Sequence, residues 1–150
     1  MHFRDALPNE AAALTQLALA SKRYWKYPEE WIEIWTDDLT ISSEYIEKNM
    51  VVVAEGGTEL LGFVSITNDD SKYYLDNLFI HPSHIRKSIG EKLVGIALDW
   101  CRQKQIKQLH LYSDPHSKGF YEKTGAVYIG EIASSSIARR TLPLMTYHLQ

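Results

Sequence analysis

Residues 75–93 carry the clearest sign of chemistry in the sequence, because an apolar stretch leads there through a loop with basic residues into a helix-like stretch. The N–H groups in the first turn of a helix have no partner within the helix, and the helix dipole makes that end positive. With Arg86 and Lys87 beside it, such a helix start predicts an anion site able to hold a diphosphate. A solvated connection between two elements is the alternative for a loop of this composition.

A group of aromatic residues lies near the N-terminus at helical spacing. The faces of aromatic rings bind cations, so these residues would suit a pocket for an amine. Helical spacing fits packing in the core equally well. Acidic residues between them would attract a basic amine, or else form a solvated helix face. The group comprises Lys22, Tyr24, Trp25, Tyr27, Trp31 and Trp35, and the acidic residues are Glu29, Glu30, Glu33, Asp37 and Asp38.

The histidines and the cysteine give little indication of a metal site or a nucleophile. His81 and His84 are three residues apart, but no carboxylate-rich or cysteine pattern completes a four-coordinate site with them. We therefore expect no metal. Cys101 follows Ala97 by one helical turn and is expected to pack in the core.

Two helices are expected to open the fold, after a short strand around Phe3. One face of a helix over residues 14–25 would carry apolar and small residues at i, i+3, i+4, i+7 and i+11, namely Leu14, Leu17, Ala18, Ser21 and Trp25. Asn9 can cap the start of this helix. A signal-peptide core is the alternative, but acidic residues precede the stretch where a secretory signal carries positive charge. The second helix is expected after Tyr27, with Pro28 in its first turn.

The remaining elements predict an α/β (α+β) fold in a single domain over residues 1–150. Apolar alternation indicates three consecutive antiparallel strands, and a strand-helix-strand crossover, which joins parallel strands, follows them. We expect a mixed, mostly antiparallel sheet of six or seven strands, flanked by about four helices. The later strands are expected over residues 51–54, 60–66, 73–80, 109–112, 127–133 and 142–149, and the later helices over residues 90–104 and 117–123.

Composition excludes several classes of protein. The 150 residues are 45% hydrophobic and 23% charged, which is typical of a globular protein rather than of a fibrous or disordered one. The net charge is −3 and the basic residues are scattered, so nucleic acid is not an expected partner. No apolar run approaches the roughly eighteen residues that span a bilayer, so no membrane partner is expected. A single cysteine forms no internal disulfide, which favours the cytoplasm.

Two motifs, in this order, resemble the GCN5-related N-acetyltransferase (GNAT) superfamily. Its acetyl-CoA loop follows a strand ending in hydrophobic-x-Pro and reads Arg/Gln-x-x-Gly-x-Gly/Ala, which resembles residues 80–90. Its Asn-x-x-Ala-x-x-Phe-Tyr-Glu-Lys-x-Gly-Phe segment resembles residues 114–126. The opening strand and helix are also similar, so that the resemblance covers the chain from about Met1 to Leu149. It implies the GNAT fold and acetyl-CoA as the cosubstrate.

Four residues depart from the family pattern. Ile85 stands where the family has Arg or Gln, and Ser88 replaces the first glycine of the loop; Asp114 and Ser117 replace Asn and Ala. Glycine is used where the backbone approaches phosphate or takes positive φ, so we expect Ser88 to weaken CoA binding unless its hydroxyl donates to a phosphate. The resemblance assigns cofactor binding to Leu78, Phe79, Ile80, Ile85, Arg86, Lys87, Ser88, Ile89, Gly90, Glu91, Lys92, Ser113, Asp114, Ser117 and Phe120.

Acetyl transfer also needs a base, which takes a proton from the amine, and an acid, which protonates the departing thiolate. By resemblance, Tyr121 is the general acid beside the CoA sulfur, and the main chain of residues 78–80 polarises the carbonyl. Packing in the core is the alternative for Tyr121. Asp76 is the candidate base, because some small-molecule acetyltransferases of the superfamily carry an acidic residue there. A carboxylate that faces outward or pairs with a cation is the alternative for Asp76.

Acceptor binding is assigned to two distant parts of the chain. Trp25, Tyr27 and Trp31 lie in the region that varies with the acceptor in this superfamily. Residues 134–144 resemble a Ser-rich loop and an Arg-x-Leu-Pro run of one branch of the superfamily, in which Arg140 would pair with an acceptor carboxylate. A surface arginine at a strand start is the alternative. An Arg140 that faces the pocket would favour acidic or amino-acid-like acceptors over polyamines.

The resemblance therefore implies an N-acetyltransferase that moves an acetyl group from acetyl-CoA directly to a primary amine of a small molecule. A protein or peptide N-acetyltransferase is one alternative, and it requires an open groove beside residues 134–140. A non-catalytic CoA-binding module is the other, suggested by Ile85 and Ser88. Similar proteins commonly dimerise, so a homodimer is a further expectation left open.

Overall fold

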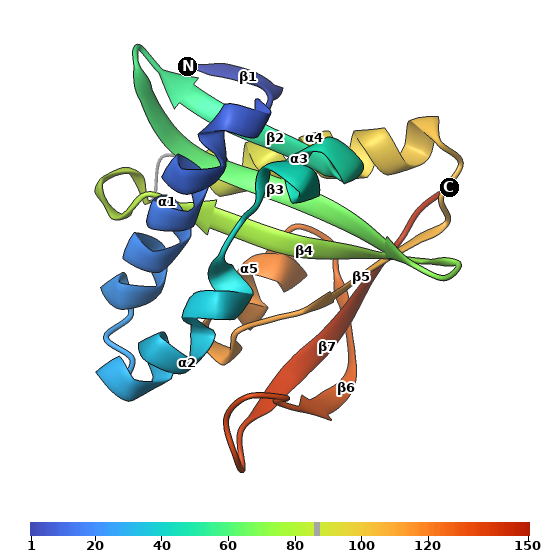
Figure 1. Cartoon of the computed structure of the whole chain (residues 1–150). Helices are drawn as coiled ribbons and strands as arrows, with labels where there is room; N and C mark the ends of the chain where they lie inside the picture. Colours follow the sequence, from blue (N-terminus) through green and yellow to red (C-terminus); the bar gives the residue numbers. More distant parts are fainter. Residues whose placement is uncertain (86–87) are drawn as a thin grey trace.

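The computed structural model describes residues 1–85 and 88–150, and the expectations for Arg86 and Lys87 lie outside these residues. Seven strands form one sheet in the order β1-β2-β3-β4-β5-β7-β6 (Figure 1). The strands are β1 (His2–Asp5), β2 (Met50–Gly56), β3 (Glu59–Asp69), β4 (Lys72–Ile80), β5 (Gln108–Tyr112), β6 (Val127–Ala133) and β7 (Thr141–His148). The α-helices in the described residues are α1 (Ala11–Tyr24), α2 (Glu29–Leu39), α3 (Ser43–Lys48), α4 (Ile89–Gln103) and α5 (Lys118–Lys123).

These elements confirm the predicted fold class, with one helix that the sequence did not reveal. Helix α3 has six residues, too few for apolar periodicity to show. The side chain of Ser42 caps it by accepting a hydrogen bond from the Tyr45 N–H at 3.0 Å. No helix among the described residues combines the length and apolar character needed to cross a bilayer.

The sheet is antiparallel except where β4 meets β5, which confirms the predicted crossover through α4. These two strands pair only at Tyr73 with Leu109 and Tyr74 with His110. Beyond Tyr74 they diverge, as Figure 1 shows. Residues 75–80 of β4 therefore have no strand partner on the β5 side within the described part of the chain, which leaves backbone N–H and C=O groups available there.

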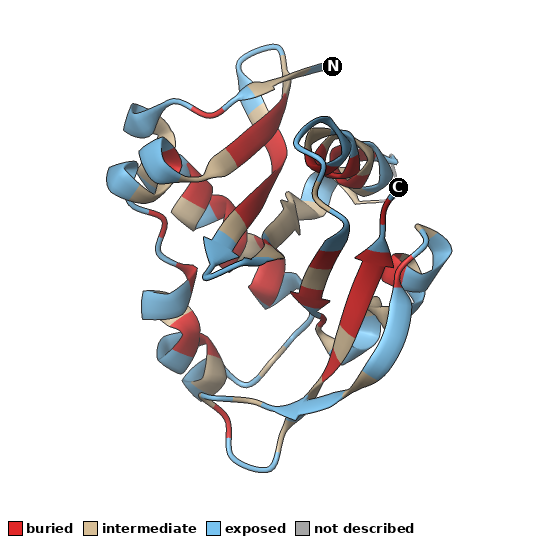
Figure 2. Ribbon diagram, turned by 90° about the vertical axis from the view of Figure 1, so that its right-hand side faces the viewer, coloured by how far each residue is buried: buried red, intermediate tan, exposed pale blue. Residues whose placement is uncertain are grey.

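Apolar side chains form a core on each face of the sheet. Alternation along β2 places Val52 and Ala54 in the core under α4, and Val51 and Val53 in the core under α1, α2 and α3. Figure 2 shows the buried positions on the strands and on the helix sides that face them. Cys101 is fully buried in the first core, as predicted.

A β-bulge interrupts this alternation in β4. Ser65 pairs with Asn77 and Ile66 pairs with Leu75, so Asp76 is an extra residue without a partner in register. Leu75 packs in the core under α4 and Leu78 returns to that core. The bulge therefore allows both Asp76 and Asn77 to turn toward α3, an arrangement that a period of two cannot predict.

Candidate active site

Two clefts meet between the diverging strands. The larger cleft, of about 510 Å³, is bordered by β4, the start of α4 and α5. The smaller cleft, of about 300 Å³, is bordered by β4, α2 and the loop that precedes β7. Leu78, Ser117 and Tyr121 line both. A molecule in one cleft can therefore reach a molecule in the other at these residues.

The larger cleft combines an anion site with an apolar wall. Helix α4 makes its first main-chain bond from the Lys92 N–H to the Ser88 carbonyl, which leaves the N–H groups of residues 89–91 unpaired within the helix. No side chain caps them within the described residues. The apolar wall consists of Leu78, Ile80, Ile85, Ile89 and Phe120. This donor set fits a phosphate group, and the wall fits a pantetheine chain.

The loop at the start of α4 needs an unusual backbone conformation at Ser88. Its φ is 62°, in the left-handed region that favours glycine. Ser88 stands where the family pattern has a glycine, so the departure seen in the sequence falls on a strained residue. Gly90 has a different role: a Cβ there would lie 3.2 Å from the Phe120 ring, so glycine lets α4 and α5 approach each other.

The structure places most of the residues assigned to the cofactor along the larger cleft. Lys92 is exposed and does not line it, and Ser113 is buried, with its hydroxyl donating to the Asp114 carbonyl at 2.6 Å. Phe79 and Asp114 line the smaller cleft instead. The assigned residues that line the larger cleft are Leu78, Ile80, Ile85, Ser88, Ile89, Gly90, Glu91, Ser117 and Phe120.

Tyr121 lies at the junction of the two clefts. It is buried, and burial raises the pKa of its hydroxyl well above the ordinary value of tyrosine. The hydroxyl has no hydrogen-bond partner in residues 1–85 and 88–150. It therefore stays protonated at neutral pH and can donate to a group placed between the clefts.

Asp76 lines the smaller cleft and belongs to a polar network with α3. Its Oδ2 accepts hydrogen bonds from the Tyr45 hydroxyl at 2.5 Å and from Asn77 Nδ2 at 3.3 Å. The Tyr45 hydroxyl also lies 2.9 Å from Ser65 Oγ. Burial, together with the negative Asp76, raises the pKa of Tyr45 above the ordinary tyrosine range. Tyr45 therefore remains a hydrogen donor that orients the carboxylate.

A charge cluster of Lys22, Asp114 and Arg140 forms one wall of the smaller cleft. Lys22 Nζ lies 2.9 Å from both carboxylate oxygens of Asp114, and Arg140 Nη2 lies 3.1 Å from Oδ1. Burial opposes ionisation of Asp114, but Lys22 and Arg140 hold the pKa of its carboxyl below the ordinary value. Asp114, predicted to bind the cofactor, thus anchors two cations.

Aromatic rings surround this charge cluster. Lys22 Nζ lies 4.4 Å from the centroid of the Trp35 ring, and the Arg140 guanidinium lies 5.0 Å from it. Tyr27 and Trp31 also face Arg140, at 5.3 and 5.6 Å. The predicted aromatic site for cations therefore exists, but the protein's own cations occupy it. Trp25 lies apart, in the larger cleft, with its ring centroid 4.0 Å from that of His116.

Residues 134–140 form the outer wall of the smaller cleft. Trp35 Nε1 donates to Ser136 Oγ at 3.1 Å, and Ile137 is buried in the core under α1 and α2. The Ser134 N–H donates to the Arg140 carbonyl at 2.7 Å, which closes the loop on itself. Arg140 faces the cleft rather than solvent, because this loop is held against α2.

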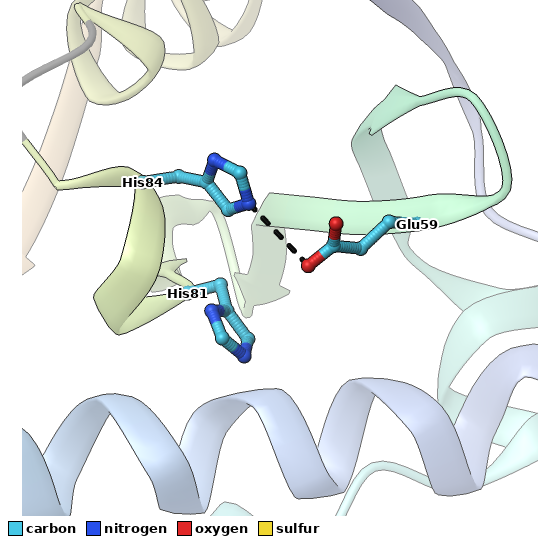
Figure 3. Close-up of side chains that lie close together, drawn as sticks. All are labelled: Glu59, His81 and His84. Atoms are coloured by element: carbon cyan, nitrogen blue, oxygen red, sulfur yellow. Dashed lines mark hydrogen bonds and ion pairs between the residues drawn. The ribbon is translucent and has the colours of Figure 1, made fainter.

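Glu59, His81 and His84 come together at the start of β3, beside the turn that follows β4 (Figure 3). Their possible ligand atoms lie within 4.8 Å of one another, and His84 Nε2 is 3.3 Å from Glu59 Oε1. Sequence reasoning missed Glu59, which lies 22 positions before His81. His81 Nδ1 accepts a hydrogen bond from the Ser83 N–H at 3.2 Å, which uses the lone pair that a neutral imidazole would offer to a metal. The cluster serves better as a polar tie between β3 and the turn after β4.

Several residues of the site had no role in the sequence-based assignment. They come into place through contacts between distant parts of the chain, which one sequence does not show. These residues are Tyr45, Ser65, Asn77 and His116.

Comparisons with known proteins agree with this fold. The model of the acetyltransferase (GNAT) family matches residues 13–126. The uncharacterized N-acetyltransferase YhfO of Bacillus subtilis (strain 168) is 24% identical over an alignment 149 positions long; the alignment covers 85% of this chain and 95% of that protein. PaiA N-acetyltransferase from Thermoplasma acidophilum, solved with coenzyme A, has a TM-score of 0.81 at 22% identity, covering 98% of both chains. Aminoglycoside 6′-N-acetyltransferase, also solved with coenzyme A, has a TM-score of 0.75 at 17% identity, covering 99% of this chain and 97% of its own.

Proposed function

Because the chain belongs to the acetyltransferase (GNAT) family, an N-acetyltransferase family that uses acetyl-CoA, we propose that it transfers the acetyl group directly to a primary amine of a small molecule. The meeting of the two clefts at Tyr121 carries this proposal. The larger cleft receives the cosubstrate, with phosphate against the first turn of α4, and the smaller cleft receives the amine.

Acetyl-CoA supplies a thioester, at which a C–N bond to the amine forms and the C–S bond breaks. Asp76 takes the proton that the attacking amine loses, directly or through a water molecule, while Tyr45 and Asn77 hold its carboxylate. Tyr121 donates its proton toward the departing sulfur, since its raised pKa keeps it protonated until then. The backbone N–H groups within residues 78–80 that point away from β3, toward the side where β5 has diverged, polarise the carbonyl.

The size of the smaller cleft supports a small acceptor over a peptide. Its volume is about 300 Å³, at the low end for small-molecule pockets. The loop of residues 134–140 walls it, and the Trp35 to Ser136 hydrogen bond holds that wall in place. A peptide would need this wall to open. The fold shared with aminoglycoside 6′-N-acetyltransferase is consistent with a small-molecule acceptor.

A calorimetric titration with acetyl-CoA, followed by a screen of amines for thiol release, tests the proposal. We expect binding and amine-dependent release of CoA. Binding without turnover on any amine would favour a non-catalytic CoA-binding module. Turnover only on peptides would favour a protein N-acetyltransferase.

We also propose that the protein acts in the cytoplasm and as a homodimer. Its single cysteine is compatible with a reducing compartment.

The proposed dimer rests on strand β6, which lies at an edge of the sheet. It exposes apolar side chains, among them Val127 and Ile129, which a second copy would cover. Light scattering at several protein concentrations tests the dimer.

A further inference from the structure

We propose that Arg140 and Lys22 form an anion-binding subsite in the smaller cleft, so that the acceptor is a small amine that also carries a carboxylate. This inference rests on the proposed function, because it names the class of acceptor for the same cleft.

The charge cluster has more positive than negative charge. Lys22 and Arg140 share one carboxylate, Asp114, and the side chains of both cations are only 11% exposed. Buried charges are ordinarily paired, because a partly desolvated cation without a partner is costly. A carboxylate on the acceptor would balance the second cation.

Unused hydrogen-bond donors of Arg140 also support a carboxylate on the acceptor. A guanidinium group has five N–H donors. Arg140 uses Nη2 twice, to Asp114 Oδ1 at 3.1 Å and to the Tyr27 hydroxyl at 3.2 Å. Nη1 and Nε have no hydrogen-bond partner within the described part of the chain, and the side chain lines the smaller cleft. An acceptor carboxylate would satisfy these donors.

The subsite also orients the acceptor. Asp76 lines the same cleft, on β4, whereas Arg140 enters it from the loop before β7. A molecule with its carboxylate at Arg140 and its amine toward Asp76 would match the charge at each place. A polyamine would place its second cation beside Lys22 and Arg140, where it would be repelled.

The test compares pairs of substrates that differ only in charge. Amino acids with a terminal amine and a chain of two to six carbons, such as β-alanine and 4-aminobutanoate, are each assayed beside the matching amide. We expect kcat/KM to be about tenfold or more higher for the best acid than for its amide, given the strength of hydrogen bonds to charged groups. In R140Q this ratio should fall to about one, and in R140K part of it should return.

The controls separate binding of the carboxylate from support of the fold. R139Q changes the neighbouring arginine, which is exposed, and should leave the ratio unchanged. A purely structural Arg140 would lower kcat/KM for acid and amide alike, and that result would overturn the inference. Equal rates on acids and amides in the wild type, or turnover only on amines without a carboxylate, would also overturn it and leave the proposed function standing. Failure to acetylate any amine would overturn both.

Discussion

Tyr45 donates a hydrogen bond of 2.5 Å to the carboxylate of Asp76, and thereby ties α3 to the bulge in β4. The bulge sends Asp76 and Asn77 toward the same helix, and Asn77 Nδ2 donates to both the Asp76 carboxylate and the Tyr45 hydroxyl. This network leaves Asp76 on the wall of the smaller cleft, where the proposed mechanism uses it as the base.

Replacing Asp76, the proposed base, should slow the chemical step. We expect D76N to lower kcat by about a hundredfold or more, as is typical for loss of a general base, with the largest loss at low pH, where most of the amine is protonated. Y45F should lower kcat less, because Asn77 still contacts the carboxylate. Rates of thiol release between pH 6 and 9 measure both effects. D69N, which changes an exposed carboxylate at the last residue of β3, serves as the control. A loss in D76N that is the same at every pH would remove Asp76 as the base.

Ser88 should limit stability, because its φ of 62° is unfavourable for a residue with a Cβ. We expect S88G to raise the free energy of unfolding by about 0.5–1 kcal/mol and to bind acetyl-CoA at least as tightly. Urea unfolding and calorimetry measure the two properties. Q105G, at a φ of 60° just after α4, should gain stability without a change in affinity. Weaker acetyl-CoA binding by S88G would instead assign the Ser88 hydroxyl to a phosphate.

Asp114 should make stability depend on pH. The pKa of its carboxyl is lower in the folded protein than the roughly 3.9 of an unfolded aspartate. The contribution of Asp114 to the free energy of unfolding is therefore fully present above the unfolded pKa. It is lost as the pH falls through the lower pKa of the folded protein. We expect D114N to be less stable by about 3 kcal/mol at pH 7, because Lys22 and Arg140 lose their partner.

Urea unfolding at pH 7 and pH 3 tests this contribution, and the difference between D114N and the wild type should shrink at the lower pH. The exposed pair of Asp99 and Arg102 gives the control, since D99N should cost at most about 1 kcal/mol. An equal difference at both pH values would show that Asp114 acts through packing and not through its charge.

The thiol of Cys101 should be unreactive in the folded protein. It is fully buried, and burial raises its pKa to about 11. A chromogenic disulfide reagent should therefore label the native protein slowly and the unfolded protein completely, at its single cysteine. Rapid labelling of the native state would contradict the packing of α4 on the sheet. Slow labelling also allows CoA release to be followed with the same reagent.

Most of the sheet could be predicted because its signals are local. The apolar alternation that predicts strands over residues 51–54 and 60–66 lies within a few residues of each strand, and these segments became β2 and β3. Helix α3 escaped prediction because it is short. The orientation of the Asp76 side chain could not be predicted, because a bulge depends on how two strands pair. The alternation along one strand does not show that pairing.

The acceptor side depends on contacts between distant residues. Lys22 and Asp114 are 92 positions apart, and Asp114 and Arg140 are 26 apart. Their residue types fit other roles equally well, and Asp114 falls within a motif that predicted cofactor binding. Only the folded chain shows that they form one charge cluster and that Trp25 lies in the other cleft.

The most direct measurement compares the wild type with Y121F for CoA release, for the mass of the acetylated amine and for acetyl-CoA affinity by calorimetry. We predict that the wild type adds one acetyl group to the amine, and that Y121F lowers kcat by about a hundredfold, as for loss of a general acid. Its acetyl-CoA affinity should stay nearly unchanged, because the rest of the larger cleft is intact. Unchanged turnover by Y121F, or no acetylated amine from the wild type, would contradict the account.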